Sequence, residues 1–140
     1  GIIFLYKKRW RSAAIMIISI GATGFFVGLM KELFLRVRPE NALHIIVNDP
    51  SFPSGHAAMA AAFFVAFAYV VAPKIHSRIW RELFIVGSVL AVIIIGLTRL
   101  ILNVHWFSDV LAGWSLGVFV TTGTILLIRY LWVLIKGHQN

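Results

Sequence analysis

The sequence contains no cysteine and few acidic side chains. Its 140 residues include five aspartates and glutamates against thirteen lysines and arginines. The lack of cysteine excludes a disulfide framework, a thiolate metal site and a cysteine nucleophile. The carboxylates form neither an HExxH motif nor a paired cluster, so a protein-bound metal ion is not expected.

Charged residues of either sign are also scarce. They make up 13% of the chain, whereas a soluble domain typically carries about 25%. Hydrophobic residues make up 60%, and the mean hydropathy is +0.91. A soluble protein of this composition would lack the polar side chains needed to cover its surface. We therefore expect an integral membrane protein, with residues 1–140 forming one membrane-embedded domain.

Four apolar segments have roughly the length needed to cross a bilayer. They run over residues 12–30, 54–72, 83–98 and 107–128, the last with a possible extension to 135. The segments show no strand-like alternation, and a bilayer tolerates no open sheet edge, so each is predicted to be a helix. The sequence thus predicts an all-α fold, a polytopic bundle of four transmembrane helices.

The cations are distributed unequally between the two ends of these predicted helices. Four antiparallel spans place four cations at one end, namely Lys31, Arg36, Arg38 and Arg99. The other nine lie at the opposite end: Lys7, Lys8, Arg9, Arg11, Lys74, Arg78, Arg81, Arg129 and Lys136. Positive residues accumulate on the cytoplasmic side, so the end with four cations is expected to face outward. Membrane orientation also accounts for the net charge of +8 without a nucleic-acid partner.

The first of three polar clusters at the outward end contains Lys31 and Arg38. The two cations are seven residues apart, and a helix ended by Pro39 would place them on one face. Two cations at a membrane boundary favour an anion, and the planar guanidinium group suits phosphate oxygens. Arg36 lies between them and is interpreted as an ordinary interfacial cation.

The second cluster is the stretch Pro-Ser-Gly-His at residues 53–56. Ser54 is placed to cap the second span, and Gly55 allows close backbone approach. A helix N-terminus binds anions through its free N–H groups, and His56 in the first turn can face the same anion. A serine at this position is often only a cap, so a binding role and a capping role both remain open.

The third cluster contains Arg99, His105 and Asp109. The histidine and the carboxylate are four residues apart at the start of the last span, one helical turn from each other. A carboxylate beside an imidazole fixes its tautomer, which leaves the other ring nitrogen able to act as a nucleophile or base. The alternative is an interfacial pair without chemistry. Together, the three clusters fit phosphoryl transfer through a phosphohistidine.

In their order and internal spacing, these motifs resemble the type 2 phosphatidic acid phosphatase family, also called lipid phosphate phosphatases. The family patterns are K-x6-RP, PSGH and SR-x5-H-x3-D. They correspond here to Lys31 through Arg38-Pro39, to residues 53–56, and to Thr98-Arg99, His105 and Asp109. Thr98 stands where the family usually has serine; threonine keeps the hydroxyl group and adds a methyl group.

The resemblance implies a role for each motif residue. His105 would be the nucleophile that forms the phosphoenzyme, Asp109 its orienting partner, and His56 the general acid for the leaving group. The phosphate would be bound by Lys31, Arg38, Ser54, Gly55 and Arg99. Neither a metal ion nor another cofactor is implied.

The resemblance also implies a longer protein and a membrane substrate. Members of the membrane branch typically have six helices with these motifs on the last four, so this chain is expected to be truncated at its N-terminus. Within that branch it is most similar to the phosphatidylglycerophosphatase B type. The implied partners are the bilayer and a lipid phosphate in the cell membrane, with hydrolysis at the outer face. Phosphatidylglycerol phosphate, undecaprenyl diphosphate and phosphatidic acid remain open as substrates, and the oligomeric state is not indicated.

Two non-enzymatic alternatives remain. The chain could be a catalytically silent lipid-phosphate-binding or scaffold protein of the same fold, or an anion transporter using the same cations. The presence of both histidines and Asp109 favours an enzyme. Separately, Gly21, Gly24 and Gly28 place small residues three and four apart in the first span, and we expect close helix packing there.

Overall fold

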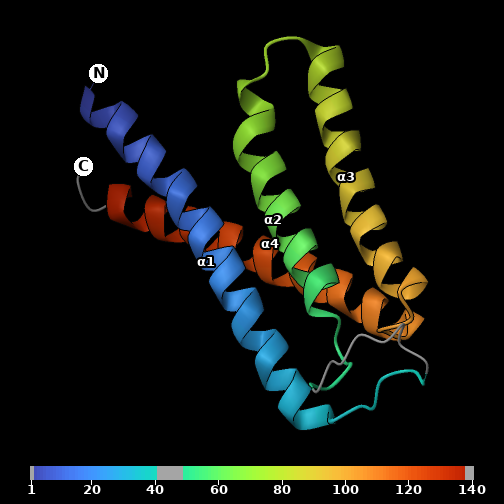
Figure 1. Ribbon diagram of the computed structural model, residues 1–140. Helices are drawn as coiled ribbons and strands as arrows, with labels where there is room; N and C mark the ends of the chain where they lie inside the picture. Colours follow the sequence, from blue (N-terminus) through green and yellow to red (C-terminus); the bar gives the residue numbers. More distant parts are fainter. Residues whose placement is uncertain (1, 41–48, 138–140) are drawn as a thin grey trace.

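The computed structural model describes residues 2–40 and 49–137, and long helices form most of this part of the chain (Figure 1). Helix α1 spans Ile2–Phe34, α2 spans Gly55–Val71, α3 spans Arg78–Ile101 and α4 spans Phe107–Gly137. A short 3-10 turn, η1, follows α2 at Ala72–Lys74. The predicted all-α bundle of four helices is confirmed. Three of the four helices extend beyond the predicted apolar segments because polar and interfacial residues continue their backbone hydrogen bonding.

The distribution of side chains is that of a membrane protein. Each of the four helices contains an apolar stretch long enough to cross a bilayer. Large apolar side chains such as Ile94, Phe119 and Leu126 face outward, whereas the hydroxyl-bearing Thr23 and Thr121 are completely buried. An apolar exterior around an interior of small and polar side chains is expected where lipid, not water, surrounds the bundle.

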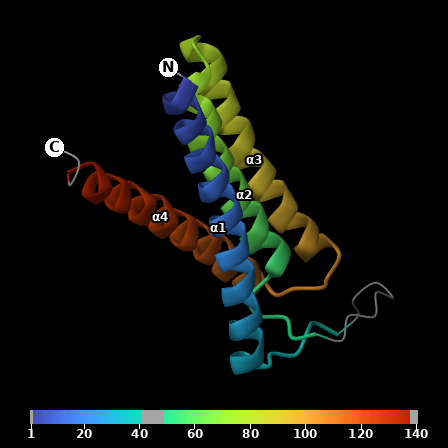
Figure 2. The same cartoon turned by 90° about the vertical axis from the view of Figure 1, so that its left-hand side faces the viewer.

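Helix α2 lies at the centre of the bundle and contacts α1, α3 and α4. Helix α4 runs obliquely to the other three, as the two perpendicular views show (Figures 1 and 2). The alternating direction of the helices brings the ends of α1 and α3 and the starts of α2 and α4 to one end of the bundle (Figure 1). All three polar clusters lie at or beside these termini, so the fold places them at the same end.

Two glycines of α4 allow its close approach to α2. A Cβ atom at Gly113 would lie 2.6 Å from the carbonyl oxygen of Ser54, and one at Gly117 would lie 2.8 Å from Cβ of Ala61. The facing side of α2 is built from buried alanines, including Ala57, Ala58, Ala61 and Ala62. Small residues on both helices therefore bring the start of α2 against the start of α4, where the second and third polar clusters lie.

The close packing predicted for the glycines of α1 is not found within the described residues. A Cβ atom at Gly21 or Gly28 would meet nothing within 4 Å, and one at Gly24 would meet only Sδ of Met59, at 4.0 Å. The spacing of the glycines shows that small residues share a face of α1, but it does not show whether that face meets another helix.

We expect Gly117→Val to lower the midpoint of thermal unfolding, because the added side chain would collide with the backbone of α2. Overpacking of a well-packed interior costs about 1–3 kcal/mol. Gly123→Val is the matched control, since a Cβ atom at Gly123 of the same helix meets nothing within 4 Å. Both variants should be compared with the parent protein by a thermal-shift assay in one detergent. Equal midpoints for the two variants would contradict the packing role of Gly117.

Candidate active site

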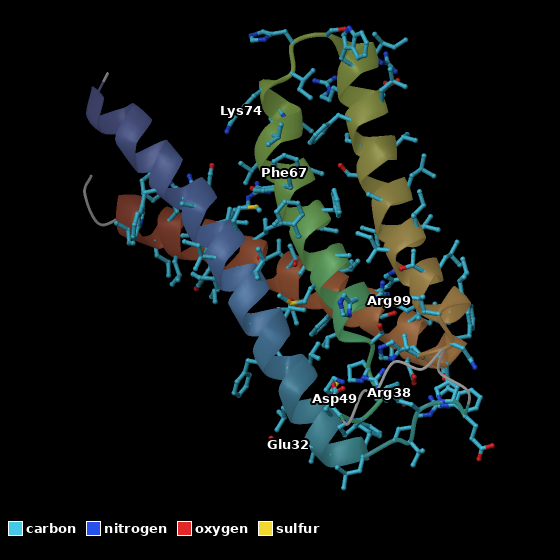
Figure 3. The ribbon with its side chains drawn as sticks, viewed as in Figure 1. Glu32, Arg38, Asp49, Phe67, Lys74 and Arg99 are labelled. Atoms are coloured by element: carbon cyan, nitrogen blue, oxygen red, sulfur yellow. The ribbon has the colours of Figure 1, made fainter. Side chains whose placement is uncertain are left out.

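The candidate site is a cavity of about 320 Å³ at the end of the bundle where the three polar clusters meet. Figure 3 shows Arg38, Asp49 and Arg99 gathered at this end, with Lys74 at the far end of α2. The cavity lining includes five of the eight predicted site residues, together with Asp49 and Met59: Lys31, Arg38, Gly55, His56 and His105. Ser54 and Asp109 lie next to these lining residues, and Arg99 is in the last turn of α3.

The first cluster is built differently from the sequence prediction. Helix α1 ends at Phe34, and the next residue, Leu35, has the left-handed φ value of 44°. Lys31 and Arg38 therefore do not share a helical face, and that prediction was wrong. Pro39 restricts only its predecessor, Arg38, and the helix ends four residues before that, at Phe34. Both cations nevertheless reach the cavity.

Asp49 connects these two cations. Its carboxylate forms ion pairs with Lys31 and, at 2.8 Å, with Nη2 of Arg38, whose Nε donates to the Asp49 carbonyl oxygen at 2.9 Å. Burial raises the pKa of Asp49, but hydrogen bonds and charges from the two cations outweigh this effect and hold the pKa below its usual value. Asp49 is thus an ionised carboxylate against the cations that would face a substrate phosphate.

Ser54 and the start of α2 form the second part of the site. Ser54 occupies the predicted N-cap position with an extended backbone, but its side chain makes no capping hydrogen bond. The hydroxyl oxygen is buried and has no hydrogen-bond partner in the described part of the chain. The Ser54 amide donates to the Asp109 carbonyl oxygen at 2.9 Å, which ties α2 to α4. A buried hydroxyl group without a partner beside Gly55 and His56 is suited to a ligand oxygen.

His105 lies just before α4 and is 5% exposed. Its Nε2 is 3.3 Å from Nη1 of Arg38, and its Nδ1 is 3.5 Å from Oδ2 of Asp109. A guanidinium group can only donate, so Nε2 is the accepting nitrogen and the proton resides on Nδ1, toward the carboxylate. The lone pair of Nε2 accepts from Arg38 in this structure, and both residues line the cavity.

The surroundings of His105 favour its neutral form. Burial and then the Arg38 guanidinium lower the pKa of His105, and the Asp109 carboxylate and the Ser51 carbonyl oppose this only in part. The pKa therefore lies below its usual value of 6.5. A neutral imidazole at neutral pH retains the lone pair that nucleophilic attack requires.

Asp109 is completely buried and is held by more partners than the sequence indicated. Nη1 of Arg36 donates to its Oδ1 at 2.7 Å, and the Trp106 amide donates to its Oδ2 at 2.9 Å. Nη1 of Arg36 also donates to Oγ of Ser108 at 2.7 Å. The interpretation of Arg36 as an ordinary interfacial cation was therefore wrong, because its guanidinium turns inward onto the buried carboxylate.

Arg99 contacts the residue at which the chain departs from the family pattern. Its Nε donates to Oγ1 of Thr98 at 3.2 Å, and that hydroxyl group donates to the Ile95 carbonyl oxygen at 2.7 Å. The hydroxyl that threonine shares with serine thus remains in contact with the guanidinium. Arg99 also interacts electrostatically with His56, so it contributes positive charge beside the cavity.

The model of the PAP2 superfamily matches residues 12–133. This chain belongs to the PAP2 superfamily. Phosphatidylglycerophosphatase B of Bacillus subtilis is 34% identical to this PAP2 chain over 119 residues, which cover 84% of the chain and 58% of the relative. Undecaprenyl-diphosphatase of Sulfolobus acidocaldarius is 28% identical over 127 residues, covering 86% and 57%. The PAP2 chain thus spans less than three fifths of the length of either relative.

A solved structure confirms the membrane PAP2 fold. The crystal structure of a transmembrane PAP2 type phosphatidylglycerolphosphate phosphatase from Bacillus subtilis matches with a TM-score of 0.76 at 23% sequence identity. The match covers 93% of this chain and 71% of that one. The predicted resemblance to the PAP2 family and to its phosphatidylglycerophosphatase B type is confirmed by these findings.

Two charged residues of this PAP2 site, Arg36 and Asp49, were not predicted from the sequence to take part in it. Arg36 lies beyond the end of α1, in a segment without regular secondary structure. Pro39 indicated that the helix must end before it, which was the available signal that Arg36 need not follow a helical spacing. Asp49 gave no comparable signal, because it reaches Lys31 and Arg38 across a loop and at no helical spacing.

Proposed function

We propose that this chain forms the membrane-embedded catalytic domain of a lipid phosphatase that works through a phosphohistidine intermediate without a metal ion. The observation that carries this proposal is the geometry of His105. Its Nε2 contacts Arg38 in the lining of a cavity that also includes Lys31, and its Nδ1 faces the buried carboxylate of Asp109. A neutral nucleophile beside cations is the combination that attack on a phosphate ester needs.

In the first step, Nε2 of His105 attacks phosphorus and the bond from phosphorus to the leaving oxygen breaks. His56 gives a proton to that oxygen, which leaves as the lipid alcohol or, from a diphosphate, as the lipid monophosphate. In the second step, water attacks phosphorus of the phosphohistidine while His56 takes a proton from that water. The bond from phosphorus to Nε2 breaks, and inorganic phosphate leaves. His105 is then neutral again.

The remaining site residues bind the phosphate in this proposal. Lys31, Arg38 and Arg99 neutralise the charge of the nonbridging oxygens, and the hydroxyl group of Ser54 and the amide of Gly55 donate to them. Asp49 would be displaced from the cations by the incoming phosphate. Its side chain is about half exposed, at 52%, so it can turn outward without loss of a packed environment.

We place the site at the outer face of the cell membrane because nine of the thirteen cations lie at the opposite end of the predicted spans. A substrate would keep its tails in the bilayer and present its phosphate at the interface. The cavity contacts account for recognition of the phosphate and not of the tail. The names of the relatives favour phosphatidylglycerol phosphate and undecaprenyl diphosphate, and phosphatidic acid has the same chemistry.

The full-length protein, purified in detergent with EDTA, is expected to release phosphate from at least one of these three lipids. The relative rates would identify the preferred lipid, and glycerol 3-phosphate would show how much of the rate depends on the lipid tail. Failure to release phosphate from all three lipids would contradict the proposal and favour a silent binding protein. A strict requirement for added divalent metal would contradict the metal-free mechanism.

A further inference from the structure

The carboxylate of Asp109 can assist His105 only if one of its oxygens is held toward the imidazole. Asp109 is completely buried, so it depends on protein donors in place of water. Oδ2 faces Nδ1 of His105 and accepts from the Trp106 amide, while Oδ1 accepts from Arg36. Each oxygen thus has its own set of partners, and Arg36 is the only cation within ion-pair distance of the carboxylate among the described residues, apart from His105 itself.

Arg36 is itself held on both sides. Its carbonyl oxygen accepts from the Ser51 amide at 2.8 Å, and Nη1 donates to Oγ of Ser108 at 2.7 Å as well as to Asp109. Its guanidinium carbon lies 5.6 Å from the ring centre of Trp106. The segment that contains Arg36 is therefore fixed against the first turn of α4, which also carries Asp109.

We propose that Arg36 is a positioning residue for the phosphatase reaction, acting on His105 through Asp109. It fixes the orientation of the carboxylate by occupying Oδ1, so that Oδ2 remains directed toward Nδ1. The proposal rests on the proposed function. Arg36 is not among the residues that line the cavity, so its role differs from that of Arg38, which faces the substrate phosphate.

The reaction itself explains why such a residue matters. When Nε2 bonds to phosphorus, the imidazole gains positive charge, and the Asp109 carboxylate stabilises that charge only if it is ionised and correctly oriented. Arg36 occupies Oδ1 and so prevents rotation of the carboxylate. Removal of Arg36 would free the carboxylate to turn away from Nδ1, and Asp109 would then stabilise positive charge on His105 less well.

The prediction is that Arg36→Gln lowers kcat about 10- to 100-fold, as loss of a hydrogen-bonded outer partner typically does, and leaves KM within about 2-fold of the parent value. Arg36→Lys should restore most of the rate, since both side-chain bonds leave from the single nitrogen Nη1 and an ammonium group can donate both. Arg78→Gln is the matched control, because Arg78 pairs with Glu82 on an exposed surface. It should leave kcat unchanged.

A second measurement separates positioning from a general loss of structure. The pKa of His105 can be followed by NMR of labelled histidine, with His105→Ala assigning the signal. It should fall in Arg36→Gln, because a carboxylate turned away from Nδ1 no longer raises it, and should stay near the parent value in Arg36→Lys. The titratable and charged groups that face His105 are Arg38, Asp109, Lys31, Asp49 and His56, and none of them is changed in these variants.

Combination with Asp109→Asn completes the test. If Arg36 acts through Asp109, adding Arg36→Gln to Asp109→Asn should lower kcat by less than about 2-fold further. Unchanged kcat in Arg36→Gln, a rise in KM alone, or full additivity with Asp109→Asn would each overturn the proposal. If the parent protein releases no phosphate, the proposed function fails, and an unchanged or higher pKa of His105 in Arg36→Gln would separately overturn the positioning role.

Discussion

His105→Ala is expected to lower phosphate release by on the order of 10⁴-fold or more, since the substitution removes the only nucleophile that the proposed mechanism uses. His56 also lines the cavity, but its proposed role is proton transfer. His76→Ala is the matched control, because His76 is exposed between η1 and α3, outside the residues that line the cavity. It should retain the parent rate.

The same variant tests the covalent intermediate directly. Rapid acid-free quenching of the parent protein with a radiolabelled lipid phosphate should trap label on the chain, and a phosphohistidine should lose that label in acid while retaining it in base. His105→Ala should trap none. Substantial phosphate release by His105→Ala, or trapped label that survives acid, would show that another group attacks phosphorus.

The helices were predictable because their signal is local. A bilayer imposes an apolar length on each span, and the four segments show it in consecutive residues. The convergence of the three clusters followed from the alternating direction of the spans alone. The sequence could therefore place Lys31, His56 and His105 at one end of the bundle without any knowledge of side-chain contacts.

The contacts of Arg36 and Arg38 were not predictable, because they depend on how the chain leaves the end of α1. The early end of α1 at Phe34 and the positive φ of Leu35 take Arg36 and Arg38 out of the helix and away from its spacing. That change sends Arg36 to Asp109 and Arg38 to His105 and Asp49. Pro39 restricts the backbone conformation of the residue before it, but it does not determine the residue at which the helix ends.

The packing of α4 on α2 was missed for a related reason. Glycines spaced by four residues occur in both α1 and α4, and the sequence does not show which set faces a neighbour. Gly113 and Gly117 approach the backbone of α2, whereas Gly21 and Gly28 have open space beside them within the described residues. Which set of glycines meets a neighbour depends on how the helices pack in the whole bundle, in which α4 runs obliquely (Figure 2).

His56→Ala is expected to lower turnover of a lipid phosphomonoester by about 10²- to 10⁴-fold, the usual contribution of a general acid or base. The effect should depend on the leaving group. A lipid alkoxide is a strong base and needs a proton as it departs, whereas p-nitrophenolate is stable without one. His56 is an exposed residue in the first turn of α2 and lines the cavity, which allows it to exchange its proton with water.

The decisive measurement is the first turnover with p-nitrophenyl phosphate. In His56→Ala, a burst of p-nitrophenol close to one per active site should precede a slow phase, because attack by His105 no longer requires an acid but hydrolysis of the phosphohistidine still lacks its base. With the lipid substrate the same variant should show no burst. Absence of the burst with p-nitrophenyl phosphate would mean that His56 binds the phosphate or supports His105, and that the leaving group takes its proton from elsewhere.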